Sequence, residues 1–131
     1  MATYGLLGRR LGHSYSPQIH GQLGSAPYEL FEVEPEDVGE FIANGSWDGI
    51  NVTIPYKRDA ARLATVRSPR VERTGAANTL VRDEAGIIAE NTDVLGFAWM
   101  LSAFARRELG CSAHDAFEGR KALVLGSGGA S

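Results

Sequence analysis

The sequence lacks the features that mark secreted, membrane-bound or disulfide-stabilised proteins. Its 131 residues include one cysteine, Cys111, so no disulfide can form within the chain. No apolar run approaches the ~20 residues that a membrane-spanning helix requires, and the first residues lack the basic and long apolar regions of a signal peptide. We therefore expect a cytoplasmic protein with no membrane partner, in which Cys111 is a free thiol without a catalytic role.

Clustered basic charge and metal-ligand spacing are also missing. The net charge is −3 at pH 7, and the arginine pairs at 9–10 and 106–107 are short enough to be solvated surface. We therefore expect no nucleic-acid partner. His13 and His20 have no acidic residue or cysteine at ligand spacing, which argues against a metal site. With 44% hydrophobic and 22% charged residues, the chain has the composition of an ordinary globular domain with its own core.

Apolar patterning predicts strands and helices in alternation. Strands are expected where short apolar runs end at glycine or proline, and helices where serine, proline or aspartate precedes helical spacing. This alternation predicts a three-layer α/β/α domain with a twisted, mostly parallel sheet, which is mixed because of one hairpin. The expected strands are 4–8, 28–33, 48–54, the hairpin 77–81 with 86–89, and 120–125; the expected helices are 17–23 capped by Ser16, 35–43, 57–64, 70–73 and a long one after Asp93.

The last residues combine a strand pattern with a glycine cluster. Residues 122–125 are apolar and lead directly into Gly126, Gly128 and Gly129, as in the first turn of a dinucleotide-binding βα unit. Glycines in such a turn let a pyrophosphate approach the backbone. A plain strand followed by a flexible tail explains the same residues equally well. Because the strand would have no sheet to join within the chain, we expect the sequence to be a fragment.

A hydroxyl-rich loop before Pro17 is the first candidate for ligand binding. Ser14 and Ser16 are two positions apart beside a predicted helix start, where their side chains could hold a carboxylate. Capping of the helix by Ser16, with Ser14 merely exposed, is the alternative.

The second candidate is the end of the strand at 48–54. Asn51 and Thr53 lie on one face of this strand, at the place where α/β folds bind ligands. Lys57 follows, in a chain where 11 of the 13 basic residues are arginine. A proton-transfer site requires lysine, because arginine stays protonated in proteins. A surface lysine on a helix is the alternative.

Two asparagine-containing segments complete the set of candidates. Asn78 lies in Gly-Ala-Ala-Asn-Thr-Leu (75–80), and Asp93 ends Asn-Thr-Asp (91–93) immediately before the long predicted helix. Asn78 could also cap a turn, and Asp93 could also serve as a helix N-cap.

Together these segments resemble the shikimate dehydrogenase family. The resemblance covers essentially the whole chain, and four ordered motifs at family-like separations make it specific. They are Gly-His-Ser-Tyr-Ser-Pro-Gln-Ile-His (12–20), Gly-Ile-Asn-Val-Thr-Ile-Pro-Tyr-Lys (49–57), Gly-Ala-Ala-Asn-Thr-Leu (75–80) and Asn-Thr-Asp (91–93) with Gly96-Phe97.

The resemblance implies an NADP-dependent enzyme that interconverts 3-dehydroshikimate and shikimate, as a monomer or homodimer. It implies a substrate-binding domain at 1–110 and, at 111–131, a linker with the first strand and turn of an NADP-binding Rossmann domain. A quinate/shikimate dehydrogenase and a non-catalytic shikimate-binding module are the alternatives. Ala89-Glu90 stand where the family usually has glycine. The implied roles are Lys57 and Asp93 in catalysis, Ser14, Ser16, Thr53, Asn78 and Asn51 in substrate binding, and Gly126, Gly128 and Gly129 in cofactor binding.

Overall fold

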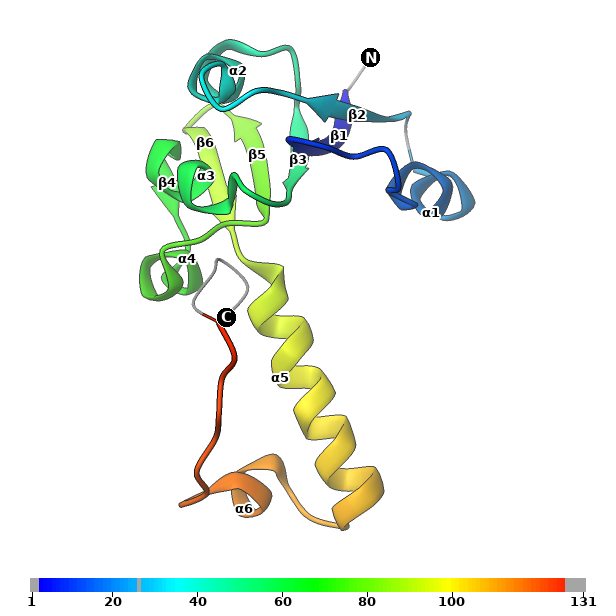
Figure 1. Cartoon of the computed structure of the whole chain (residues 1–131), viewed down its shortest axis with the longest axis vertical. Coiled ribbons are helices and arrows are strands. Elements are labelled where there is room, and N and C mark those ends of the chain that lie inside the picture. Colours follow the sequence, from blue (N-terminus) through cyan, green and yellow to red (C-terminus); the bar gives the residue numbers. More distant parts are fainter. Residues whose placement is uncertain (1–2, 26, 127–131) are drawn as a thin grey trace.

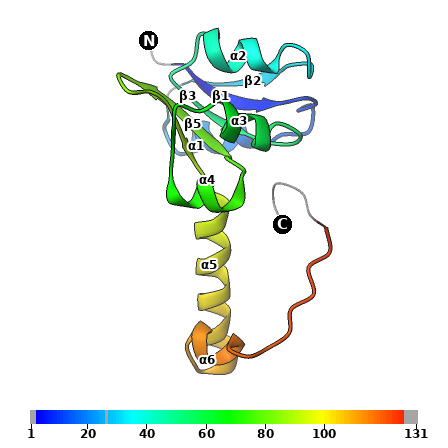
Figure 2. The same cartoon turned by 90° about the vertical axis from the view of Figure 1, so that its left-hand side faces the viewer.

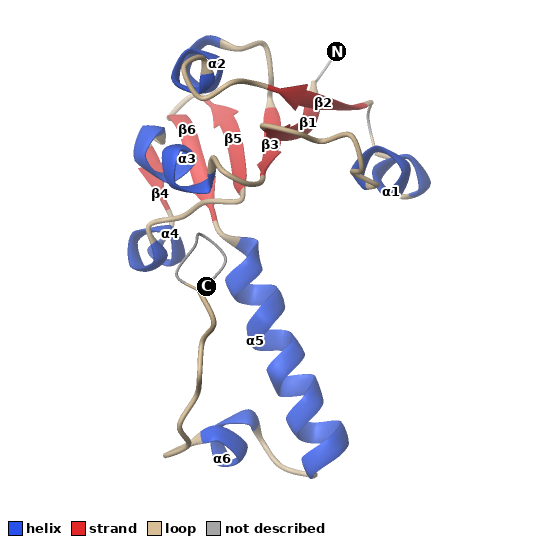
Figure 3. Cartoon of the chain, viewed as in Figure 1, coloured by secondary structure: helices blue, strands red, loops and turns tan. Residues whose placement is uncertain are grey.

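A six-stranded sheet runs through the computed structural model, which describes residues 3–25 and 27–126 (Figures 1 and 3). The strand order is β2-β1-β3-β5-β6-β4. The strands are β1 (Tyr4–Gly8), β2 (Tyr28–Glu32), β3 (Gly49–Val52), β4 (Val66–Arg67), β5 (Thr79–Asp83) and β6 (Gly86–Glu90). The helices are α1 (Ser16–Gln22), α2 (Val38–Asn44), α3 (Lys57–Leu63), α4 (Pro69–Thr74), α5 (Thr92–Phe104) and α6 (Ala113–Phe117).

One strand runs against the others. β1 pairs in parallel with β2 and β3, and β4 pairs in parallel with β6, whereas β5 is antiparallel to both β3 and β6. The start of β5 therefore lies at the same edge of the sheet as the ends of β1, β3 and β6. This confirms the predicted α/β fold with a mixed sheet, and it brings four chain segments to one edge.

Helices α2 and α3 cover one face of the sheet and form the core with it. Leu7 of β1, Ile50 of β3 and Leu80 of β5 point to this face and are at most 2% exposed. Ile42 of α2 and Ala60 of α3 pack against them and are fully buried. Burial of these apolar side chains is the main source of stability in this part of the chain.

The opposite face of the sheet has little cover. Figure 2 shows α3 in front of the sheet and α1 behind it, but α1 has no buried residue. Tyr4, Leu30 and Val81 on this face remain 39%, 39% and 46% exposed. The predicted three-layer arrangement is therefore uneven, with a packed helical layer on one face and α1 alone on the other.

Proline and serine mark the helix starts, though not always at the predicted residue. Ser68 caps α4, because its hydroxyl accepts a hydrogen bond from the Val71 N–H, and Gly75 ends the helix with φ 64°. An acidic helix was predicted to begin at Pro35. This prediction was wrong by three positions, since the helix, α2, begins at Val38. The residues between them form a turn in which the Asp37 N–H donates to the Glu34 carbonyl.

Helix α5 leaves the sheet and extends away from it (Figure 1). None of its residues is buried, and Trp99 and Phe104 are 70% and 45% exposed. It continues into a π-helical turn, Ala105–Leu109, which ends at Gly110 with φ 67°. None of the helices in the described ranges is long and apolar enough to cross a membrane.

The predicted strand at 120–125 is absent from this structure. Residues 121–126 are irregular and exposed. A strand needs a neighbour for its main-chain N–H and C=O groups, and none of the six described strands lies beside this segment.

The unequal cover of the two faces predicts unequal effects of the same substitution. Leu80→Ala should lower the free energy of unfolding by about 2–5 kcal/mol, because it leaves a cavity in the core. Leu30→Ala, on the open face, should cost less than about 1 kcal/mol. Urea unfolding of both variants of the 131-residue chain measures the difference. Equal losses would contradict this assignment of the core to one face.

Candidate active site

Three segments meet where β3 ends, β5 starts and β6 ends, and main-chain hydrogen bonds hold them together. The Val52 N–H donates to the Asn78 carbonyl at 2.8 Å, and the Asn78 N–H donates to the Glu90 carbonyl at 3.1 Å. The Ala77 N–H donates to the Lys57 carbonyl at 2.8 Å. The backbone thus fixes the start of α3 against the residues that precede β5.

Lys57 and Asp93 form an ion pair across this junction. Lys57 Nζ lies 2.6 Å from Asp93 Oδ2. The lysine side chain is only 15% exposed, whereas the aspartate side chain is 46% exposed. Asp93 Oδ1 accepts a second hydrogen bond, from Asn78 Nδ2 at 2.9 Å. The structure therefore brings together three of the predicted site residues, with the carboxylate open to solvent on one side.

Asp93 is free to pair with lysine because Asn91 caps the helix. The Asn91 side-chain oxygen accepts hydrogen bonds from the N–H groups of Asp93 and Val94. Asn91 is 2% exposed, and its amide nitrogen donates to the Ala76 carbonyl at 3.0 Å. The alternative role of Asp93 as N-cap is therefore excluded in this structure. Aspartate in the first turn remains favourable beside the positive end of the helix.

Glu90 supports this cap from the preceding residue. Its carboxylate accepts hydrogen bonds from Arg70 at 2.6 and 2.9 Å, from the Ser68 hydroxyl at 2.7 Å and from the Asn91 N–H at 2.7 Å. The hydrogen bonds from Arg70 lower the pKa of Glu90 to about 2, and those from Ser68 and Asn91 act in the same direction. The charge at position 90, which departs from the family pattern, is directed to Arg70 and the cap.

Ser14 and Thr53 lie in the loops that follow β1 and β3, and Ser16 lies at the start of α1. Ser14 Oγ accepts a hydrogen bond from the Ser16 N–H at 3.2 Å. Ser16 is the first helical residue of α1, so the prediction that it is the cap was wrong. The Thr53 N–H donates to the Leu7 carbonyl at 2.9 Å. Within residues 3–25 and 27–126, no hydrogen bond links these three side chains to Lys57, so their part in a common site stays a prediction.

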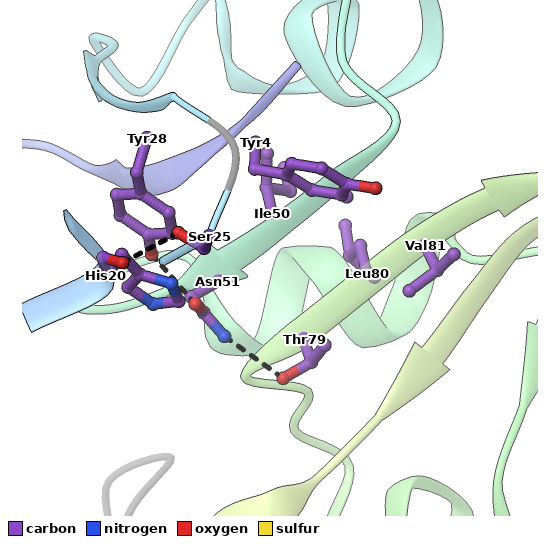
Figure 4. Close-up of a pocket in the computed structure, with 10 residues that line it drawn as sticks. Tyr4, His20, Ser25, Tyr28, Ile50, Asn51, Thr79, Leu80 and Val81 are labelled. Carbon is purple, nitrogen blue, oxygen red and sulfur yellow. Dashed lines mark hydrogen bonds between the residues drawn. The ribbon is translucent and has the colours of Figure 1, made fainter. Parts of the chain in front are cut away.

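Asn51 lies in a pocket of about 290 Å3 on the open face of the sheet (Figure 4). Its Oδ1 accepts a hydrogen bond from the Tyr28 hydroxyl at 2.7 Å, and its Nδ2 donates to Thr79 Oγ1 at 3.3 Å. The His20 ring stacks on Tyr28 at 3.9 Å between centroids. Burial raises the pKa of Tyr28 to about 12, so the phenol stays protonated at physiological pH.

Of the three glycines predicted to bind a cofactor, one lies within the described residues. Gly126 has φ 114°, a conformation that favours glycine, while Gly128 and Gly129 lie outside the described residues. The residues before Gly126 form no strand, so the described part of the chain gives no phosphate-binding βα turn. Within that same part, no group of three or more His, Cys, Asp or Glu residues could hold a metal ion.

Several site residues were missed by reasoning from the sequence. Asn91 had a signal, since asparagine directly before an apolar helix is a strong N-cap residue. Thr79 had a weaker signal, because it follows Asn78 and shares a face with Asn51 in the register of β3 and β5. Tyr28 had none, since its contact with Asn51 depends on how β2, β1 and β3 lie side by side.

These features define an α/β domain with a lysine–aspartate pair, the candidate site, at one edge of a mixed sheet. The family described as shikimate dehydrogenase substrate binding domain matches residues 6–80, which is more than half of the chain. The chain belongs to this family. The resemblance indicated by the four sequence motifs is thereby confirmed.

Individual relatives agree with this family. Shikimate dehydrogenase (NADP(+)) of Clostridium beijerinckii is 36% identical over 139 residues, in an alignment that covers 100% of this chain and 48% of the relative. Shikimate dehydrogenase 1 from Peptoclostridium difficile aligns with 99% of this chain at a TM-score of 0.78 and 33% identity, over 48% of its own chain. Shikimate 5-dehydrogenase from Thermus thermophilus, in complex with shikimate, aligns with 99% of this chain at a TM-score of 0.78 and 31% identity, over 49% of its own chain. The chain spans about half the length of the curated relatives it matches.

The contacts of Glu90 predict a specific loss of stability in acid. A carboxylate whose pKa is lowered from 4.5 to about 2 on folding stabilises the folded state fully above pH 4.5, and this stabilisation disappears as the pH falls toward 2. The variant Glu90→Gln lacks this titration. Its free energy of unfolding should be lower than that of the parent at pH 7, and the gap should close as the pH approaches 2.

Urea unfolding of the parent chain and Glu90→Gln, repeated between pH 7 and pH 2, measures this gap. All other carboxylates titrate in both proteins, so the difference isolates Glu90. A gap that stays constant over the whole range would show that Arg70 does not hold Glu90 ionised.

Proposed function

We propose that this chain is the substrate-binding half of an NADP-dependent shikimate dehydrogenase, which interconverts 3-dehydroshikimate and shikimate. The observation that carries the proposal is the 2.6 Å contact between Lys57 Nζ and Asp93 Oδ2, with Asn78 held by the same carboxylate. Family membership supports it. The protein would act in the cytoplasm, as a monomer or homodimer.

Lys57 is the acid–base group in this proposal. Reduction of a ring ketone leaves an oxygen that needs a proton, and the ammonium form of Lys57 supplies it. In the reverse direction the amine form takes the proton from the hydroxyl group. Asp93 holds the ammonium toward the edge of the sheet, and its exposed side can accept a hydrogen bond from a neighbouring ring hydroxyl. When bound, NADPH supplies the hydride.

The remaining predicted residues hold the other substituents of the ring. The hydroxyl groups of Ser14, in the loop that follows β1, and of Ser16, at the start of α1, would donate to the substrate carboxylate. Thr53 and Asn78 would bind ring hydroxyls near Lys57. Asn51 has one hydrogen bond from its Nδ2 to Thr79, which leaves its second N–H to donate to substrate. In the complete protein, Gly126, Gly128 and Gly129 would form the turn that receives the cofactor pyrophosphate.

The binding part of the proposal can be tested on the 131-residue chain. Shikimate should shift the NMR amide signals of Ser14, Ser16, Lys57, Asn78 and Asp93, even if the affinity is only millimolar. Cyclohexanecarboxylate, which has the carboxylate without ring hydroxyls, should shift the two serines and leave the other three signals in place. Identical shift patterns for both compounds, or shifts elsewhere in a folded sample, would refute the assigned substrate contacts.

The catalytic part requires the complete gene product that carries these residues. Lys57→Ala should lower kcat for NADP-dependent shikimate oxidation by roughly 10²–10⁴-fold, because the proton-transfer group is lost. Lys57→Arg should be similarly impaired, since arginine keeps the charge but stays protonated. Arg62→Ala, an exposed position on the same helix, is the control and should keep parental turnover. Turnover within twofold of the parent in either Lys57 variant would remove lysine from this role.

A further inference from the structure

An unbroken series of side-chain hydrogen bonds leads from Tyr28 to Lys57. The Tyr28 hydroxyl donates to Asn51 Oδ1 at 2.7 Å, and Asn51 Nδ2 donates to Thr79 Oγ1 at 3.3 Å (Figure 4). Thr79 Oγ1 then donates to Asn78 Oδ1 at 3.1 Å. Asn78 Nδ2 donates to Asp93 Oδ1 at 2.9 Å, and the other oxygen of Asp93 accepts from Lys57.

The donors and acceptors in this series can be arranged in one direction only. The Tyr28 hydroxyl donates to the oxygen of the Asn51 amide, which leaves the amide nitrogen to face Thr79. A threonine hydroxyl has one hydrogen. Because Thr79 accepts from Asn51, it directs that hydrogen to the Asn78 oxygen. The nitrogen of the Asn78 amide is then the end that faces Asp93.

The orientation of Asn78 matters because its two ends differ in charge. A reversed amide would place its carbonyl oxygen, which is partially negative, against the negatively charged Asp93 carboxylate, and the two would repel each other. It would also remove the acceptor for the Thr92 N–H, which now donates to Asn78 Oδ1 at 2.9 Å. Thr92 belongs to α5 itself, so among the described residues only Thr79 links the Asn78 side chain to the sheet.

We propose that Thr79, in direct contact with Asn78, and Tyr28, which acts through Asn51 and Thr79, are positioning residues that orient Asn78 and thereby hold Asp93 and Lys57 in their catalytic geometry. This inference rests on the proposed function. Thr79 and Tyr28 need no contact with the reacting atoms. Tyr28 is itself held by the stacked ring of His20, at 3.9 Å and an interplanar angle of 11°, so the series begins at a fixed point between α1 and β2.

The test compares Thr79→Val with Thr79→Ser in the complete gene product. Valine keeps the shape of threonine but removes the hydroxyl, whereas serine keeps the hydroxyl. Thr79→Val should lower kcat for shikimate oxidation about tenfold or more, as expected when a reacting group is displaced, with a smaller change in KM. Thr79→Ser should stay within threefold of the parent. A Thr79→Val enzyme within twofold of the parent, or equal losses in both variants, would overturn the proposal.

A second pair of variants tests the other end of the series and guards against a misfolded Thr79→Val. Tyr28→Phe removes the first donor and should lower kcat by about threefold to tenfold. Tyr4→Phe is the matched control, because Tyr4 lines the same pocket on the neighbouring strand and its hydroxyl makes no hydrogen bond to any described residue. It should leave kcat unchanged. Equal effects of the two substitutions would show that kcat depends on the pocket rather than on the hydrogen-bond series.

The side-chain amide of Asn78 gives a readout that does not depend on turnover. In the 131-residue chain, its NMR signals should move or broaden in Thr79→Val and Tyr28→Phe, and keep their parental positions in Thr79→Ser and Tyr4→Phe. A parent enzyme that fails to oxidise shikimate while these signals respond as expected would refute the proposed function and leave the positioning role intact. An active parent whose Asn78 signals are the same in all four variants would refute the positioning role alone.

Discussion

The site depends on main-chain pairing around Asn78. Its N–H and carbonyl groups bond to β6 and β3, while the preceding N–H bonds to the first residue of α3. These bonds are short-range and directional, so they fix the separation of the segments to a few tenths of an ångström. Side chains as different as lysine, asparagine and aspartate can then meet with little further loss of conformational entropy, because the backbones that carry them are already ordered.

One residue, Asn91, caps helix α5, and another, Asp93, carries the charge that pairs with Lys57. The buried amide of Asn91 satisfies the first N–H groups of the helix, and Glu90 fixes Asn91 through its main-chain N–H. Asp93 therefore does not cap the helix. Its carboxylate accepts hydrogen bonds from Lys57 and Asn78 and remains partly exposed to solvent. An aspartate that had to cap the helix could not accept both of these bonds at once. The helix is thus a rigid support for a carboxylate that stays available to a ligand.

Sequence patterns predicted the elements of this fold well and its contacts less well. Glycine, proline and alternating apolar residues were enough to predict β1, α3 and the β5–β6 hairpin, because these signals are local. Lys57, Asn78 and Asp93 were found through their motifs and are in contact. Tyr28 could not be found, since its partner Asn51 lies two strands away. The strand expected at 120–125 failed for a related reason: local pattern indicates β-propensity, whereas a strand exists only beside a partner.

The reversed direction of β5 also decides where the chain can accept inserted residues: the β5–β6 turn can accept them, whereas the strands themselves cannot. The β5–β6 hairpin enters and leaves the site at the same edge, so its turn between Asp83 and Gly86 lies at the opposite edge of the sheet. Extra residues in that turn would lengthen a loop remote from Asn78 and Asp93. A single residue inserted within β5 would exchange the two faces on one side of the insertion, so Thr79 and the rest of the strand could not both keep their present faces. The domain can therefore acquire new surface at one edge through insertions while the contacts of Lys57, Asn78 and Asp93 at the other edge are preserved.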